Sequence, residues 1–161
     1  EHSLVANEDK VFVTTRNGYS SVDLSFSRIE AINTDDYTVR QVLNASNIEG
    51  NTASFIKASV VVSAEKGYFY ATKAVFTPSY YEISSLYEFN PTTGAIISAD
   101  VAETGTENIS FITLDAANFL WVSVANPEAP GVDIVDTTTG TKHISRLATT
   151  LNPDTIRFIE E

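Results

Sequence analysis

The side chains best suited to bind a ligand stand next to one another in the middle of the chain. Tyr80, Tyr81 and Glu82 are consecutive, and Tyr19 lies at the corresponding place of an earlier segment. A tyrosine ring offers a broad apolar face and a polar tip, which suit sugar rings, peptides and protein surfaces. Tyrosines also cover the edges of sheets, so packing is the alternative explanation. We predict Tyr19, Tyr80, Tyr81 and Glu82 as ligand-binding residues.

Groups suited to catalysis are scarce. The two histidines, His2 and His143, are far apart in the sequence, and cysteine is absent. A two-histidine metal site or a Ser-His-Asp triad is therefore a poor fit, and the nucleophile-elbow, P-loop and zinc-protease motifs are missing. The many acidic residues, Asp115 and Asp133 among them, are expected to form a solvated surface. We expect no catalytic residue, no metal ligand and no cofactor.

The charge balance excludes several classes of partner. The chain has 161 residues, of which 21 are acidic and 10 are Lys or Arg, for a net charge of −11. Such a chain is a poor ligand for nucleic acid or an anionic membrane surface, and no apolar run reaches the roughly 20 residues that a membrane helix needs. Asn44 and Asn108 begin glycosylation sequons, which is compatible with the extracellular, periplasmic or cell-surface location that we expect.

The elements that position these residues recur along the chain. A strand rich in aromatic and β-branched residues is followed by a second apolar strand that ends in Asn or Asp, and then by a turn. The turns Asn90–Gly94 and Asp136–Gly140 are close copies. Another apolar strand, which is strand A, precedes each group and is expected to be buried on both faces. The two strands described first are B and C, and a short strand D follows the turn. Four strands, A to D, thus form a unit of about 50 residues, with very little helix.

The predicted units divide the whole chain as a single segment. Blade 1 covers about 1–46, blade 2 about 54–103 and blade 3 about 108–149, and a terminal strand over 154–160 begins a fourth unit. Phe12, Phe69 and Trp121 occupy matching places in strand B. We expect these three rings to pack between neighbouring sheets, with Trp121 as part of the core.

The repeat carries a family resemblance. Leu120–Ser123, read Leu-Trp-Val-Ser, and Gly131–Gly140, read Gly-Val-Asp-Ile-Val-Asp-Thr-Thr-Thr-Gly, resemble β-propeller repeats. The likeness is closest to the lactonase-like (YVTN-type) propellers of secreted and surface proteins, whose Tyr-Val-Thr-Asn signature is echoed at Val13–Thr15 and Val122–Asn126. This resemblance implies an all-β propeller fold. The family includes lactonases and members that only bind, so fold does not decide the function.

Three blades do not close a ring, since propellers have about four to eight. Three explanations stay open: the chain is part of a longer propeller, two copies close into a six-bladed ring, or the blades pack on another chain. The B–C connections, over 17–25, 75–85 and 126–131, and the D–A connections, over 44–54, 103–108 and 148–154, are the long ones. They are expected to emerge at one end, where long loops concentrate binding residues.

These observations favour a non-catalytic binding or scaffold module that recognises a protein, a small molecule or a carbohydrate through the long B–C and D–A loops. The alternative is a hydrolase of the lactonase-like type whose catalytic or metal residues lie mostly outside this chain. A third interpretation is structural, with the open sheet edges joining the chain to another one, either a second copy or the remainder of a longer propeller.

Overall fold

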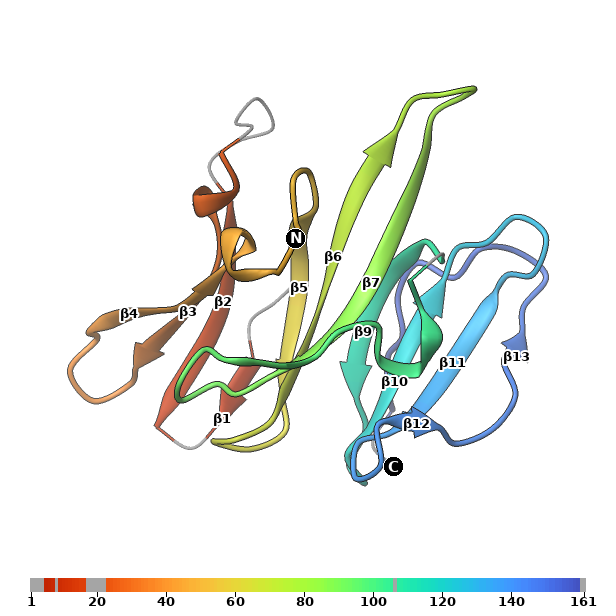
Figure 1. The fold of residues 1–161 in the computed structure, drawn as a ribbon. Coiled ribbons are helices and arrows are strands. Elements are labelled where there is room, and N and C mark those ends of the chain that lie inside the picture. Colours follow the sequence, from red (N-terminus) through yellow and green to blue (C-terminus); the bar gives the residue numbers. More distant parts are fainter. Residues whose placement is uncertain (1–4, 8, 17–22, 106, 160–161) are drawn as a thin grey trace.

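The computed structural model describes residues 5–7, 9–16, 23–105 and 107–159 of the chain. It contains three antiparallel sheets (Figure 1), which confirms the all-β prediction. Helical structure in the described ranges is limited to three 3-10 turns, which are Leu24–Phe26, Ala45–Asn47 and Val101–Glu103. None of these described turns has the length or apolar character that crossing a bilayer requires.

Each sheet is a meander in which consecutive strands pair. The first sheet contains β1 (Val5–Asn7), β2 (Lys10–Arg16), β3 (Ser27–Asn33) and β4 (Val39–Asn44). The second contains β5 (Phe55–Val61), β6 (Gly67–Val75), β7 (Tyr81–Phe89) and β8 (Ile96–Ser98). The third contains β9 (Ile109–Leu114), β10 (Phe119–Val124), β11 (Gly131–Asp136), β12 (Thr141–Lys142) and β13 (Leu147–Ala148). The last two both pair with β11, so the predicted D strand is split in two.

The copied turns have the chemistry that their sequence predicts. In the second sheet, the Asn90 side chain accepts hydrogen bonds from the backbone N–H groups of Thr92 and Thr93, each at 2.9 Å. Gly94 closes that turn with a φ of +76°, which a residue without Cβ adopts at little cost. Gly140 has a φ of +71° at the equivalent place, and Tyr37 takes it with a φ of +58° in the first sheet. The three turns therefore mark equivalent positions in the three sheets.

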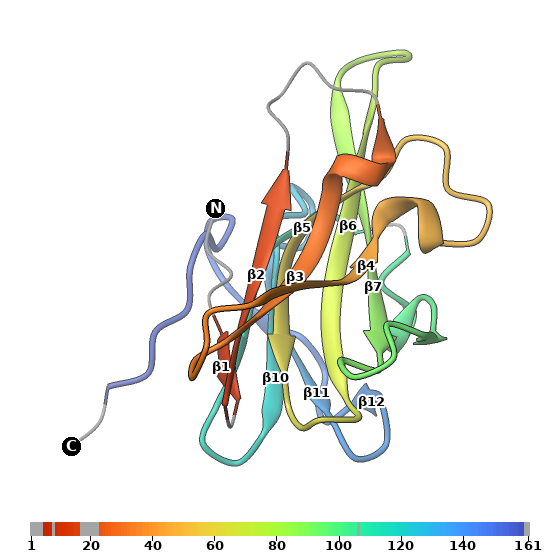
Figure 2. The ribbon, with the colours of Figure 1, turned by 90° about the vertical axis from the view of Figure 1, so that its left-hand side faces the viewer.

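The three sheets lie face to face, so the second is covered on both sides (Figures 1 and 2). One apolar cluster joins the first and second sheets, through Phe12, Ile29, Phe69 and Phe89 among others. A second cluster joins the second and third sheets. β5 is accordingly almost wholly buried, whereas only Ile109 and Ile112 of β9 are buried. The expectation that strand A is buried on both faces is thus right for β5 and wrong for β9, whose sheet has an open face.

The predicted match of Phe12, Phe69 and Trp121 is wrong by one residue. Phe12 pairs with Ala31, Tyr68 with Glu88 and Trp121 with Ile134, and each partner lies two residues before the turn residue Asn33, Asn90 or Asp136. Tyr68, rather than Phe69, is therefore the equivalent of Phe12 and Trp121. A shift of one residue in a strand moves every side chain to the opposite face of its sheet, so Phe69 points toward the first sheet and Tyr68 toward the third.

Trp121 consequently does not lie between two sheets, which corrects its assignment to the core. It is half-buried on the open face of the third sheet, where its Nε1–H donates to Asp115 Oδ2 at 2.8 Å. The Phe158 ring meets it edge-on, with centroids 5.5 Å apart.

The segment predicted as the strand 154–160 forms no strand over its described residues, 154–159. A strand needs a ladder partner, and the second strand of a fourth sheet, which would supply one, is not formed by the described part of the chain. The segment is held instead by Phe158 against Trp121 and by a 2.6 Å hydrogen bond from the Ser110 hydroxyl to the carbonyl of Pro153.

Candidate functional site

A cavity of about 450 Å³ opens at the end of the second and third sheets where their long connections meet. This volume lies within the range of small-molecule sites, about 300–1,000 Å³. Its lining comes from the β6–β7 hairpin, the connection before β9, the β10–β11 loop and the segment after β13. The lining residues are Tyr80, Tyr81, Glu82, Ile83, Glu107, Asn108, Ala125, Asn126, Pro127 and Asn152. Three of the four predicted ligand-binding residues, Tyr80, Tyr81 and Glu82, are thereby brought together, and the fourth, Tyr19, lies outside the described residues.

The aromatic side chains project from a hairpin that is longer than predicted. β6 and β7 stay paired out to Val75 and Tyr81, so Tyr81 and Glu82 belong to a strand rather than to the predicted 75–85 loop. The ladder continues because no Gly or Pro lies within Tyr68–Val75 or Tyr81–Phe89 to weaken the pairing of the two strands. The ribbon extends beyond the body of the sheet (Figure 1). It therefore carries its tyrosines out to the rim of the cavity.

The rim is aromatic and accessible. The Tyr80 and Tyr81 side chains are 62% and 46% exposed, and the Phe76 ring lies 5.6 Å from that of Tyr80. The Tyr80 hydroxyl donates a 2.9 Å hydrogen bond to Glu82 Oε1. This bond raises the pKa of Tyr80 above its ordinary value, because the phenol is then the donor to a carboxylate. The Tyr80 hydroxyl is thus tied to Glu82 while its ring is exposed to solvent.

The opposite wall is a set of interlocked polar groups. Glu107 accepts a 3.0 Å bond from the Asn126 side-chain amide and a 2.9 Å bond from Arg146 Nη2. The Ala125 N–H donates to the carbonyl of Asn108 at 2.8 Å. These bonds tie the β10–β11 loop to the connection before β9. The wall is therefore held in place before any ligand arrives, which lowers the ordering cost of binding.

Behind this wall lies a buried carboxylate that sequence reasoning missed. Asp133 is 0% exposed and is bound by Arg146 through Nε and Nη2, both at 2.9 Å, and by Lys142 Nζ at 3.1 Å. Burial is the largest single influence and raises the pKa of Asp133, but the hydrogen bonds and charges of Arg146 and Lys142 together lower it below the ordinary value. The same bonds raise the pKa of Arg146. The expected solvated position of Asp133 is thus wrong.

A sign that Asp133 is buried was present in the sequence. Asp133 and Val135 are two residues apart in β11, so both side chains point to the same face of the sheet. Val135 is buried, and a carboxylate placed beside it needs a cation. Asp115 also departs from the predicted solvated surface, since one of its oxygens binds the Trp121 indole and the other accepts from the N–H groups of Ala117 and Phe119. Asp115 therefore shapes the β9–β10 turn.

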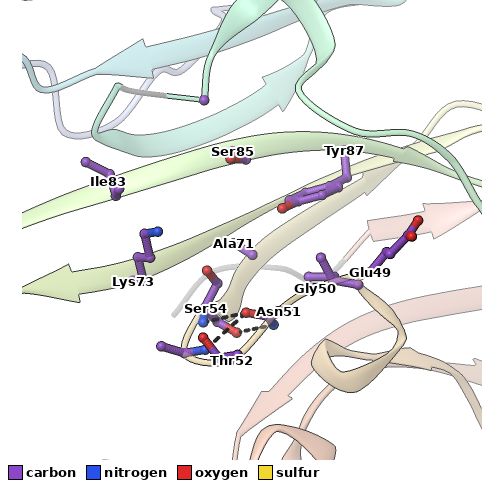
Figure 3. Close-up of a pocket in the computed structure, with 13 residues that line it drawn as sticks. Glu49, Gly50, Asn51, Thr52, Ser54, Ala71, Lys73, Ile83, Ser85 and Tyr87 are labelled. Atoms are coloured by element: carbon purple, nitrogen blue, oxygen red, sulfur yellow. Dashed lines mark hydrogen bonds between the residues drawn. The ribbon is translucent and has the colours of Figure 1, made fainter.

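A smaller hollow of about 190 Å³ lies beside the second sheet, between the 48–54 connection and the outer parts of β6 and β7 (Figure 3). Asn51 and Ser54 form one side, and Lys73 and Tyr87 face it. The Asn51 amide donates to the carbonyls of Ala45 and Ser54 and accepts from the N–H of Ser54. These bonds use the Asn51 side chain to hold the connection in place. This hollow therefore offers fewer groups for binding a ligand than the larger cavity does.

A third hollow, of about 410 Å³, lies at the short-turn end between the second and third sheets. Lys66 Nζ and the Tyr68 hydroxyl both donate to the carbonyl of Thr137, at 2.8 and 3.2 Å. These bonds fasten the β5–β6 turn to the β11–β12 turn. Lys66 and Thr137, which line this hollow, therefore serve to join two sheets.

Other groups with chemical potential are separate from the cavity. His143 follows β12 rather than lying within a strand, and its ring lies 4.7 Å from that of Phe119. Asn44, the first sequon residue, accepts from the Ser46 N–H and caps a 3-10 turn, whereas Asn108 lines the cavity. Within the described ranges, no three His, Cys, Asp or Glu side chains gather in a way that could hold a metal ion.

Comparisons with known proteins leave the fold and the cavity as the available guides to function. No protein family, curated protein or solved structure matches the chain. The resemblance to lactonase-like propellers stays a prediction.

Proposed function

We propose that the chain is a non-catalytic binding module that takes its ligand in the cavity beneath Tyr80 and Tyr81. The observation that carries the proposal is the convergence of four separate connections on this cavity. Two exposed tyrosines form its rim, and a fixed wall of amide and carboxylate groups faces them. An apolar ring face beside polar groups matches a carbohydrate, whose rings stack on tyrosine while its hydroxyls bond to Glu82, Asn126 and Asn152.

The hydrogen bonds of the two lining carboxylates support binding over hydrolysis. Glu107 accepts bonds on both oxygens, from Asn126 and Arg146, and Glu82 accepts one from Tyr80. Acid–base catalysis needs a carboxyl group that is free to exchange a proton with its substrate. Glu107 is thus engaged on both oxygens and suits a fixed recognition surface, whereas Glu82 has its other oxygen available for a ligand. The lactonase-like hydrolase remains the alternative.

We further propose that the three sheets are consecutive blades of a propeller that belongs to a secreted, periplasmic or surface protein. The meander order, the face-to-face stacking and the repeated Asn90 and Asp136 turns support this arrangement. The innermost strands β5 and β9 also lie against the sheet that precedes each of them. In this arrangement, the rigid sheets would hold the long connections at one end as a single surface.

Saturation-transfer NMR against a panel of neutral oligosaccharides tests the function. We expect at least one saccharide to bind, and Tyr81→Ala to weaken that binding at least tenfold through loss of the stacking face. Tyr37→Ala is the matched control, since Tyr37 is 78% exposed on a turn after β3, and it should bind as the parent chain does. Equal loss in both variants, or no binding by the parent chain, would contradict the proposal.

A further inference from the structure

Each sheet has two faces with different partners. We call the face that carries Phe12, Tyr68 or Trp121 the leading face, and the one that carries Val13, Phe69 or Val122 the trailing face. Phe12 and Phe69 belong to one apolar cluster, and Tyr68 and Val122 belong to the other. Within the chain, the leading face of a sheet thus packs on the trailing face of the next. The same contact is made twice.

The leading face of the third sheet has the residues for a third such contact. Trp121 is half-buried, whereas its equivalents Phe12 and Tyr68 are 3% and 0% exposed. Phe158 gives Trp121 its aromatic neighbour. Among the described residues, the Trp121 side chain therefore has the Phe158 ring and the Asp115 carboxylate against it in place of a sheet.

Two residues beyond these aromatics, the first and second sheets each have a polar side chain that reaches the next sheet. The Thr14 hydroxyl lies 3.1 Å from that of Ser59, and the Tyr70 hydroxyl donates to the carbonyl of Ser110 at 2.9 Å. Ser123 is the equivalent in the third sheet. Its Oγ is buried and has no hydrogen-bond partner among the described residues. An unpaired buried hydroxyl costs free energy that a partner would recover.

The trailing face of the first sheet is the matching half. Val13 and Ile32 are half-buried there, although their equivalents Phe69 and Phe89 in the second sheet are 0% exposed. The equivalence follows from the turns, since Ile32 and Phe89 each immediately precede the turn asparagine. Among the described residues, one chain therefore has both halves of the same contact without a covering sheet, at opposite ends of its stack.

We propose that the leading face of the third sheet binds the trailing face of the first sheet of a second copy of this chain. Each copy uses both faces, so two copies close a ring of six sheets, within the range of about four to eight found in propellers. The second copy displaces Phe158 from Trp121 and supplies the acceptor or donor that Ser123 lacks. This inference rests on the blade arrangement proposed above and is independent of the ligand.

Light scattering over a hundredfold concentration range tests the proposal, in about 0.15 M salt so that the net charge of each copy is screened. We expect the parent chain to have twice the mass of one copy. Val13→Lys, on one face, and Thr113→Lys, beside Trp121 on the other, should each give the mass of one copy. Ile97→Lys is the control, because Ile97 is 55% exposed on β8, and it should keep the double mass.

An equimolar mixture of Val13→Lys and Thr113→Lys should regain a two-copy species, since one of its two contacts is intact. A parent chain with the mass of one copy would overturn the proposal. So would a double mass that only Thr113→Lys abolishes, because that pattern means contact of the third sheet with itself. Circular dichroism checks that the variants fold. Tyr81→Ala should leave the mass unchanged, so failure of the ligand proposal is distinguishable from failure of this one.

Discussion

Replacing Asp133 by Asn removes a buried charge while keeping the size of the side chain. The amide retains one oxygen that can accept from Arg146, but its NH₂ group must face a donor, either Arg146 Nε at the Oδ1 position or both Arg146 Nη2 and Lys142 Nζ at the Oδ2 position. Removing one partner of a buried ion pair costs about 3–5 kcal/mol. Because the Arg146 and Lys142 side chains are 18% and 35% exposed, water replaces part of the lost interaction. We therefore expect a loss near the lower limit, about 3 kcal/mol.

The pH dependence of this loss follows from the pKa of Asp133. That pKa is lower in the folded chain than in the unfolded one, where it is about 3.9. The charged pair thus contributes its full stability above about pH 4, and the contribution is lost as the pH falls through the folded pKa. Because Asn does not titrate, the difference in unfolding free energy between the parent chain and Asp133→Asn should shrink on acidification below about pH 4.

Urea unfolding at pH 7 and at about pH 2.5 measures both effects. Glu30→Gln is the control, because its partner Arg28 lies 4.0 Å away in a partly exposed pair, and such pairs contribute about 0–1 kcal/mol. A loss at pH 7 below about 1 kcal/mol for Asp133→Asn would refute the reasoning. A loss that is equal at both pH values would refute it too, since it would arise from packing rather than charge.

Further predictions concern single turns and buried hydroxyls. Gly94→Ala should destabilise the chain by about 2–4 kcal/mol, because its positive φ strains any side chain and its Cβ would clash with the carbonyl of Val42. Gly140→Ala, with a similar φ and open space around it, should cost only about 1 kcal/mol, and equal losses in thermal unfolding would contradict the clash. Thr104→Val should cost about 1–3 kcal/mol, because the Thr104 hydroxyl accepts from the Leu86 N–H at 3.0 Å in a buried place. An unchanged Tm for Thr104→Val would show that water or another group replaces this bond.

Turn chemistry made much of the fold predictable from the sequence. The Asn90 and Asp136 turns end in glycine, and both the side-chain caps and the positive φ values follow from those residue types. The strands between the turns are equally clear in the sequence because they are rich in aromatic and β-branched residues. The face of the sheet to which each side chain points is not clear in the sequence, since Tyr68 and Phe69 are both large and apolar and fit either face. Counting back from the turns, rather than aligning the aromatics, would have given the correct match.

The candidate site was predictable only in its aromatic half. Tyr80, Tyr81 and Glu82 are adjacent in sequence, so their proximity needs no knowledge of the fold. Glu107 and Asn126 meet them through the packing of the third sheet on the second. Sequence spacing carries no signal for that meeting. Arg146 was missed for the same reason, because it reaches Glu107 across 39 positions of the chain.

Because the second sheet lies between the other two, the three sheets differ in how strongly they resist local unfolding. When stacked units contact only their neighbours, the stability of each is its own plus that of the contacts it makes. Within one copy, the second sheet makes two such contacts and each outer sheet makes one. In a single copy, backbone amides of Gly67–Thr72 and Ser84–Phe89 should therefore exchange with solvent only when the whole copy opens, whereas those of β4 and β13 exchange through local opening at the edges.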